Sequence, residues 1–362
     1  MRRALVLLAL LLATGCRLDP GEVVLTGACA GQTGTGLTAA SVKVGGIYPL
    51  SGPASAYAAV AQGARAYFAQ VNAEGGVDGR RVDFLVRDDA YQPARAVEEA
   101  RRLVLHDQVF ALFQTLGTPS TAAVREYAAR RRVPQVFVAT GATEWGADTT
   151  HPWTIGFQPS YAAEARVYAH YLATSMPGAK VAVLYQNDDF GHDLLDGFRR
   201  AIEGTTVTIV AERGYEVTDP SVQGQFANLA ASGADVLLDV STPKFAAQAL
   251  AADAAATGWN PLHILNGVAA SPAVLRPVGY DKVQGVVTAG FQKDPAAPEW
   301  AGDPAVRAYL AAMRRYAPET DPGSQQAVYG WAAAQAFVRT LERMRCPSRE
   351  ALRDAVRGLS GV

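Results

Sequence analysis

The sequence has few cysteines, no excess of charge of either sign and no long apolar run, and each of these features excludes a class of protein. Its 362 residues carry 33 basic and 34 acidic side chains, so no basic surface is available for a nucleic-acid backbone. The three cysteines form no CxxC pair, so their spacing does not indicate a metal site. The longest apolar run is too short to cross a bilayer core of about 30 Å. We therefore expect no nucleic-acid partner, no metal and no permanent transmembrane helix.

Catalytic motifs are missing as well. The sequence has no GxSxG elbow, no HExxH pair and no phosphate-binding P-loop. Its five histidines are scattered, without the spacing that metal ligands need. We expect a protein that is not an enzyme and that uses no cofactor.

The first sixteen residues have the pattern of a secretory signal. Arg2 and Arg3 form a basic start, Ala4 to Ala13 is apolar, and small residues then precede Cys16. This pattern predicts a signal peptide with a lipobox over residues 1–16 and lipidation of Cys16. The mature protein would be exported and lipid-anchored at the outer face of the cytoplasmic membrane or in the periplasm. Leu25 to Cys29 is a weaker rival lipobox, because no proper apolar run precedes it.

Residues 17–41 are predicted to form a flexible tether, because Gly27 to Ala40 is rich in glycine, threonine and alanine. Apart from Cys16, the chain has only Cys29 and Cys346, which are far apart in the sequence. Export permits a disulfide between them. Because Cys29 lies in the expected tether, two free thiols are the default expectation.

From Ser41 onward, short β-rich runs alternate with helical segments. Such alternation is typical of doubly wound parallel sheets, and two successive blocks of this kind suggest two lobes. A chain of this length is also comfortable for two domains. Strands are expected at 42–48, 81–87, 109–114, 133–139, 180–185, 207–212, 236–240, 262–265 and 285–291, and helices at 56–75, 93–106, 120–132, 161–175, 191–203, 222–232, 244–258, 304–316 and 325–346.

Three segments, taken in order, resemble one protein family: Val44 to Pro53, Val71 to Arg80 and Arg87 to Val97. They resemble the type I periplasmic binding proteins, specifically the branched-chain amino acid, amide and urea group. The resemblance implies two Rossmann-like α/β lobes with doubly wound parallel sheets, joined by a hinge. It also implies that lobe I lacks its C-terminal strands, since relatives usually continue past the last helix. Lobe I would comprise residues 42–156 and 290–362, and lobe II residues 157–289.

For function, the resemblance implies an extracytoplasmic solute-binding lipoprotein of an ABC importer. Such a protein captures a small molecule between its lobes and works with an ABC permease and its ATPase. The alternative is a ligand sensor that signals to a receptor partner through lobe closure.

Ligands of open α/β sheets bind beyond the carboxyl ends of the strands, so the loops there are the first candidates. Residues 114–121 leave an apolar strand and open a helix, presenting N–H groups and hydroxyls that suit a carboxylate. An ordinary helix cap explains the same residues equally well. Residues 139–143 look like the family's second carboxylate-contacting loop. The contacts predicted in these two loops are Thr115, Gly117, Thr118, Ala139, Thr140 and Gly141.

The resemblance adds contacts elsewhere. Tyr57, after Ser51, has the family's spacing for an aromatic wall, and Phe190 stands where relatives often place an aromatic ring over the ligand. Core packing is the alternative for both rings. Thr242 stands where leucine-binding relatives carry a tyrosine, and Asn266 where they carry a glutamate that pairs with the ligand ammonium.

Thr242 and Asn266, which differ from the residues of leucine-binding relatives at these positions, bear on the choice of ligand. Loss of a buried carboxylate that faces an ammonium costs several kcal/mol of recognition. One neutral amide oxygen is a poor replacement for it. We therefore expect a small carboxylate or amide ligand, branched-chain amino acid-like or an aromatic acid, and discrimination against leucine-like zwitterions.

Overall fold

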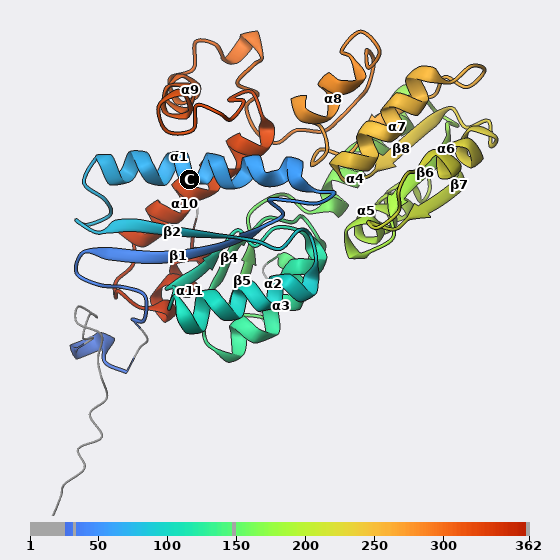
Figure 1. Cartoon of the computed structure of the whole chain (residues 1–362). Helices are drawn as coiled ribbons and strands as arrows, with labels where there is room; N and C mark the ends of the chain where they lie inside the picture. The colour runs from blue at the N-terminus through green and yellow to red at the C-terminus, as the bar shows by residue number, and fades with distance from the viewer. Residues whose placement is uncertain (1–25, 32–33, 147–149, 360–362) are drawn as a thin grey trace, which may run out of the picture.

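The computed structural model describes residues 26–31, 34–146 and 150–359, which fold into two α/β lobes (Figure 1). The first lobe contains a five-stranded parallel sheet with strand order β2-β1-β3-β4-β5, and the second a four-stranded parallel sheet with order β7-β6-β8-β9. This architecture confirms the predicted fold class. The predicted signal peptide and Cys16 lie outside the described residues.

In the first lobe, successive strand residues point to opposite faces of the sheet, and each face is covered by helices. Ala111 and Phe113 of β3 pack in one core with Phe68 of α1, whereas Leu112 packs in the other with Val124 of α3. The strands are β1 (Ser41–Tyr48), β2 (Arg81–Asp88), β3 (Ala111–Phe113), β4 (Gln135–Val138) and β5 (Thr154–Gly156), and the helices that follow in the chain are α1 (Ala58–Ala73), α2 (Pro93–Arg101) and α3 (Thr118–Arg130).

The second lobe repeats this pattern. In β6, Val181 and Val183 pack in one core with α4 and α5, whereas Ala182 and Leu184 pack in the other with α6 and α7. Its strands are β6 (Lys180–Gln186), β7 (Thr208–Tyr215), β8 (Val236–Val240) and β9 (Leu262–Leu265), and its helices are α4 (Tyr161–Ser175), α5 (Asp189–Ile202), α6 (Gln223–Ala230), α7 (Pro243–Ala255) and α8 (Pro272–Val278).

The chain then returns to the first lobe, where α10 packs beside α1 (Figure 1). Two glycines allow the close approach: a Cβ on Gly63 would meet the carbonyl of Ala327, and one on Gly330 would meet that of Val60. The returning helices are α9 (Pro304–Tyr316), α10 (Gln325–Glu342) and α11 (Arg349–Arg357).

The strand expected at 285–291 is not formed, and this prediction was wrong. Val287 makes only an isolated parallel bridge to Ile264, through bonds to the backbone of His263 and Leu265. The chain then leaves the sheet edge, and Phe291 is exposed. Among the described residues, no helix combines the length and apolarity needed to cross a membrane.

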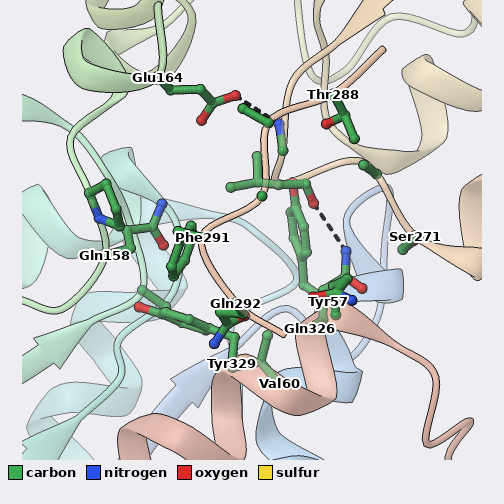
Figure 2. Close-up of a pocket in the computed structure, with 18 of the residues that line it drawn as sticks. Tyr57, Val60, Gln158, Glu164, Ser271, Thr288, Phe291, Gln292, Gln326 and Tyr329 are labelled. Atoms are coloured by element: carbon green, nitrogen blue, oxygen red, sulfur yellow. Dashed lines mark hydrogen bonds between the residues drawn. The ribbon is translucent and has the colours of Figure 1, made fainter. Parts of the chain in front are cut away.

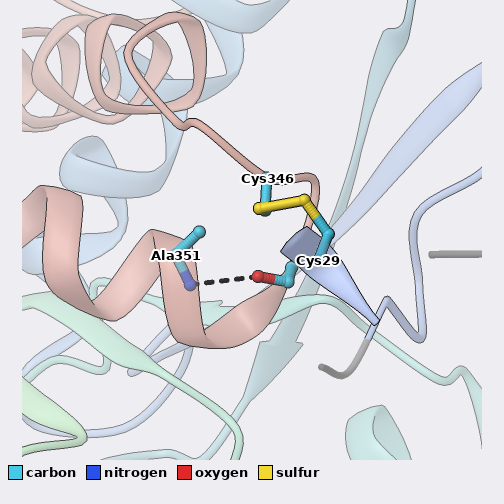
Figure 3. The surroundings of a disulfide bond; sticks show 4 residues. Cys29, Cys346 and Ala351 are labelled. Carbon is cyan, nitrogen blue, oxygen red and sulfur yellow. Dashed lines mark hydrogen bonds between the residues drawn. A yellow bond between two sulfur atoms is a disulfide. The ribbon is translucent and has the colours of Figure 1, made fainter. Parts of the chain in front are cut away.

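The expectation of free thiols was also wrong. Cys29 and Cys346 form a disulfide with their Cα atoms 5.7 Å apart (Figure 3). Farther along the expected tether, Leu37 is buried in the core of the first lobe. The backbone oxygen of Thr38 accepts a hydrogen bond from Arg80 Nε. The part of the tether that follows Cys29 is therefore fastened to the first lobe wherever the structure describes it.

Candidate ligand-binding site

A cavity of about 700 Å³ lies between the two lobes. The first lobe contributes residues after β3 and β4 and from α1 and α10, and the second contributes residues from α4, α5 and the loop after β9. The segment 288–292, which returns from the second lobe toward the first, also lines it (Figure 2). A ligand in this cavity would contact both lobes.

The start of α3 lies at one end of the cavity. Gly117 precedes the helix with φ 92°, and no described side chain caps the first turn. Unpaired N–H groups and the helix dipole therefore favour a negative group here. Thr118 Oγ1 lies 2.6 Å from Thr140 Oγ1, which also accepts a hydrogen bond from the N–H of Ala142. A carboxylate at this end would be held by backbone and hydroxyl donors.

Asp89 orients the residues around this end. It is fully buried, accepts a hydrogen bond from Ser120 Oγ at 2.7 Å and another from the N–H of Tyr91 at 2.9 Å. Tyr91 has the left-handed φ of 61°, which this bond stabilises. Asp89 thereby fixes the first turn of α3 relative to the Tyr91 ring, which lines the cavity.

Seven aromatic rings line the cavity, and we refer to five of them as the aromatic wall. Tyr161 and Phe190 meet edge to face with their ring centroids 5.1 Å apart. Burial raises the pKa of Tyr161 to about 12 and also raises that of Tyr57, so both phenols stay neutral near pH 7. The wall combines apolar area with neutral hydroxyl groups. Its members are Tyr57, Tyr91, Tyr161, Phe190 and Tyr329.

On the second lobe, Thr242 lines the cavity as part of a buried network. Its hydroxyl donates to Gln186 Oε1 at 2.9 Å, and its N–H donates to the hydroxyl of Tyr215 at 2.9 Å. Tyr215 also donates to Gln186 Oε1 at 3.2 Å. These bonds fix the loop after β8 against β6 and β7.

Glu164 is a cavity residue that the sequence interpretation missed. It lies in the first turn of α4, where Ser160 caps the helix. Its Oε1 accepts hydrogen bonds from the hydroxyl of Tyr168 at 2.7 Å and from the N–H of Gly267 at 2.8 Å. Burial raises the pKa of Glu164, although both hydrogen bonds oppose that effect. The cavity therefore does hold a carboxyl group, contributed by a helix.

Asn266 does not fill the predicted role. Its side chain is fully buried outside the cavity lining, and its Nδ2 donates to the backbone oxygens of Asp239 and Ser241 at 3.0 and 2.8 Å. Its Oδ1 accepts a bond from the N–H of Ala269. The side chain thus closes the loops after β8 and β9. Asn266 therefore contributes no side chain to this cavity, and the expected discrimination against leucine-like zwitterions stays a prediction.

Of the other predicted residues, some lie outside the cavity lining and the rest line the cavity. Ser51 donates to Asp88 Oδ2 away from the cavity, Thr115 is buried behind it, and the backbone oxygen of Gly141 accepts from the N–H of Tyr161. Thr140 supports Thr118 without lining the cavity itself. The predicted residues that do line the cavity are Tyr57, Gly117, Thr118, Ala139, Phe190 and Thr242.

Comparison with known proteins places this geometry in context. A family model described as "Periplasmic binding protein" matches residues 41–362. The Leu/Ile/Val-binding protein homolog 7 of Brucella abortus (strain 2308) is 24% identical over 336 residues, which cover 90% of this chain and 83% of that protein.

Among solved structures, a substrate-binding periplasmic protein from Ralstonia solanacearum is 26% identical, with a TM-score of 0.80 and coverage of 87% of this chain and 88% of that one. A fatty acid ABC transporter substrate-binding protein from Thermomonospora curvata is also 26% identical, with a TM-score of 0.79 and coverage of 91% and 84%. A branched-chain amino acid ABC transporter protein from Thermus thermophilus with bound valine has a TM-score of 0.77 at 20% identity and coverage of 89% and 83%.

Proposed function

Because the chain belongs to the periplasmic binding protein family, and to its branched-chain amino acid type, we propose that it binds a small carboxylate or amide solute for an ABC importer. The family is extracytoplasmic and consists of solute-binding proteins that are not enzymes. Our proposal goes further in assigning a ligand class and an import role that involves a permease and its ATPase. Nothing in the described residues favours the signalling alternative.

The observation that carries the proposal is the uncapped start of α3 at the cavity. Gly117 and Thr118 line the cavity where the helix begins, and Thr140 supports the Thr118 hydroxyl. Branched-chain amino acids and fatty acids, which the names of two relatives mention, share a carboxylate and an apolar body. The aromatic wall would take the apolar body. The cavity volume is within the usual range for sites of small molecules.

Two valine substitutions test the carboxylate anchor. The double variant Thr118→Val/Thr140→Val removes two bonded hydroxyls while keeping their shapes, so the fold should survive. If the anchor is correct, calorimetry will show carboxylate binding weakened by about 2 to 4 kcal/mol. The ligand is first chosen by thermal shift from carboxylates and their matched primary amides.

Ser51→Ala is the control, since it removes a hydroxyl of the first lobe that lies outside the cavity. It should leave affinity unchanged. Equal affinity of the wild type and the double variant would show that the anchor lies elsewhere.

We further propose that Cys16 carries a lipid that anchors the exported protein at the membrane. The basic start, the apolar run and the small residues before Cys16 support this anchoring. Cys16→Ser should move the protein into the soluble fraction. A variant that stays bound to the membrane would contradict the anchor.

A further inference from the structure

A group of arginines lies at the edge of the first sheet that is opposite the cavity. The cavity lies after β3 and β4, whereas Arg349 of α11 donates to the backbone oxygens of Val109 and Phe110, directly before β3. Arg132, just after α3, pairs with Glu350 of α11 at 3.0 Å. The end of α3 and the start of α11 therefore meet at this edge. We refer to the surface there as the arginine face, which is formed by Arg130, Arg131, Arg132, Arg343, Arg345 and Arg353.

The arginine face has an excess of positive charge. Residues 342–357 contain five arginines and three acidic residues, and residues 126–132 contain three arginines and one acidic residue. Arg131, Arg343 and Arg345 are exposed and form no ion pair with any residue that the structure describes. Because the whole chain has a net charge of -1, the rest of the molecule is net negative. The positive side of the protein thus lies opposite the cavity.

A tryptophan lies within the arginine face. The half-buried ring of Trp153 has the guanidinium of Arg353 5.0 Å from its centroid and that of Arg132 at 5.8 Å. Tryptophan combines an apolar ring with one N–H donor, and it is enriched where a protein meets a membrane interface. Arginine can bury its apolar stem while its guanidinium binds a phosphate. A surface that combines both side chains suits anionic lipid headgroups.

The disulfide places the arginine face close to the predicted lipid anchor. Cys346 directly follows Arg345, and its partner Cys29 comes thirteen residues after Cys16. A fully extended chain of that length spans at most about 45 Å. A lipid on Cys16 would therefore hold this face near the membrane.

We propose that the arginine face binds the membrane surface through anionic lipid headgroups and turns the cavity away from the membrane. This inference rests on the proposed function, specifically on the anchor at Cys16. In this orientation the cavity would stay open to solutes. Salt screens exposed charges, so the contact is reversible and leaves the protein free to reach a permease.

Vesicle sedimentation tests the proposal with the Cys16→Ser protein, which has no lipid of its own. At low ionic strength, we expect at least about tenfold tighter binding to phosphatidylglycerol-containing vesicles than to pure phosphatidylcholine vesicles. Added salt should remove most of this difference. In the same protein, Arg343→Glu/Arg345→Glu should abolish the preference. The fold should survive, because neither side chain has an ion pair with a described residue.

Arg314→Glu/Arg315→Glu is the matched control. It makes the same change of charge on α9, which lies beyond α1 on the side of the lobe away from α11 (Figure 1). The control should keep the preference for anionic vesicles. If both double variants lose it equally, net charge and not the arginine face makes the selection, and the proposal fails.

Quenching of tryptophan fluorescence by brominated phosphatidylglycerol locates the contact. The Cys16→Ser protein should lose more emission on these vesicles than the same protein with Trp153→Phe. Equal quenching of the two would contradict contact through the arginine face. Equal binding to anionic and neutral vesicles would overturn this inference alone, because the Cys16→Ser protein needs neither the anchor nor a bound solute for this test.

Discussion

Gly117 shows how one residue shapes the end of the cavity where α3 begins. The chain turns there from the loop after β3 into α3. Gly117 has φ 92°, a backbone conformation that residues other than glycine rarely adopt. A Cβ at this position would also lie 2.6 Å from Cε2 of Tyr91. The glycine therefore allows both the turn and the packing of an aromatic ring against the start of the helix.

Gly117→Ala should weaken ligand binding and destabilise the fold by about 1 to 3 kcal/mol, because it adds backbone strain and a clash with Tyr91. Gly178→Ala is the matched control, since Gly178 has a similar φ of 81° with no neighbour near its Cβ position. The control should lose stability but keep affinity. Denaturant unfolding and calorimetry measure the two effects. Affinity that is unchanged in Gly117→Ala would contradict the role given to this turn.

Whether a site residue was predictable from sequence depended on where it lies in the fold. Gly117, Thr118, Ala139 and Thr242 follow parallel strands, and such loops lie at the edge of the sheet where ligands bind. Glu164 comes from a helix, and it lines the cavity only because of how the lobes are placed. Its spacing of four residues from Tyr168 was the one sequence signal available, and that spacing is common on helices.

At the scale of elements, the alternation of β-rich runs and helical segments predicted eight of the nine strands that the structure describes to within a few residues, and it missed the short edge strand β5. The prediction failed at 285–291, where the composition suits a strand but the chain forms only one bridge before leaving the sheet. The short helices α8 and α11 were also missed. Their packing depends on contacts with distant parts of the chain, as when Arg349 of α11 donates to the backbone oxygens of Val109 and Phe110.

A buried ionic cluster joins three elements of the second lobe. His263 of β9 bonds through Nδ1 to Asp253 of α7 at 2.9 Å, and through Nε2 to Asp239 of β8 at 3.3 Å. Burial alone would lower the pKa of His263, but the bonds to the two aspartates outweigh it and raise the pKa to about 9. The cluster is therefore positively charged at its centre near pH 7.

This raised pKa predicts how stability depends on pH. Because the folded pKa of His263 lies above the unfolded value of about 6.5, its stabilising effect is complete below pH 6.5 and is lost as the pH rises through 9. The free energy of unfolding should fall over that interval, by about 3 kcal/mol at most. Denaturant titrations of wild type and of His263→Gln measure the slope, with exposed His106→Gln as control. The same slope in all three proteins would contradict this account.

At the scale of the whole molecule, the Cys29–Cys346 disulfide links the beginning of the described chain to the segment between α10 and α11. The composition of residues 27–40 gave no sign of this link, because a disulfide depends on which segments meet in space. Such bonds persist in oxidising compartments, which agrees with an extracytoplasmic protein.

The cavity also contains apolar side chains that are exposed to solvent. Val167 of α4 is 56% exposed and Phe291 of the returning segment is 54% exposed, although both line the cavity. Closure of the lobes around a ligand would bury such surface. A ligand that contacts both lobes would favour the closed form in proportion to its differential affinity for it.

Small-angle X-ray scattering tests the central claim, that a carboxylate ligand is captured between the lobes. The radius of gyration should fall when the wild-type protein is saturated with a carboxylate whose binding calorimetry has established. At the same ligand concentration, Thr118→Val/Thr140→Val should keep the larger radius. A wild-type protein that is saturated by calorimetry and yet keeps its radius of gyration would contradict capture between the lobes.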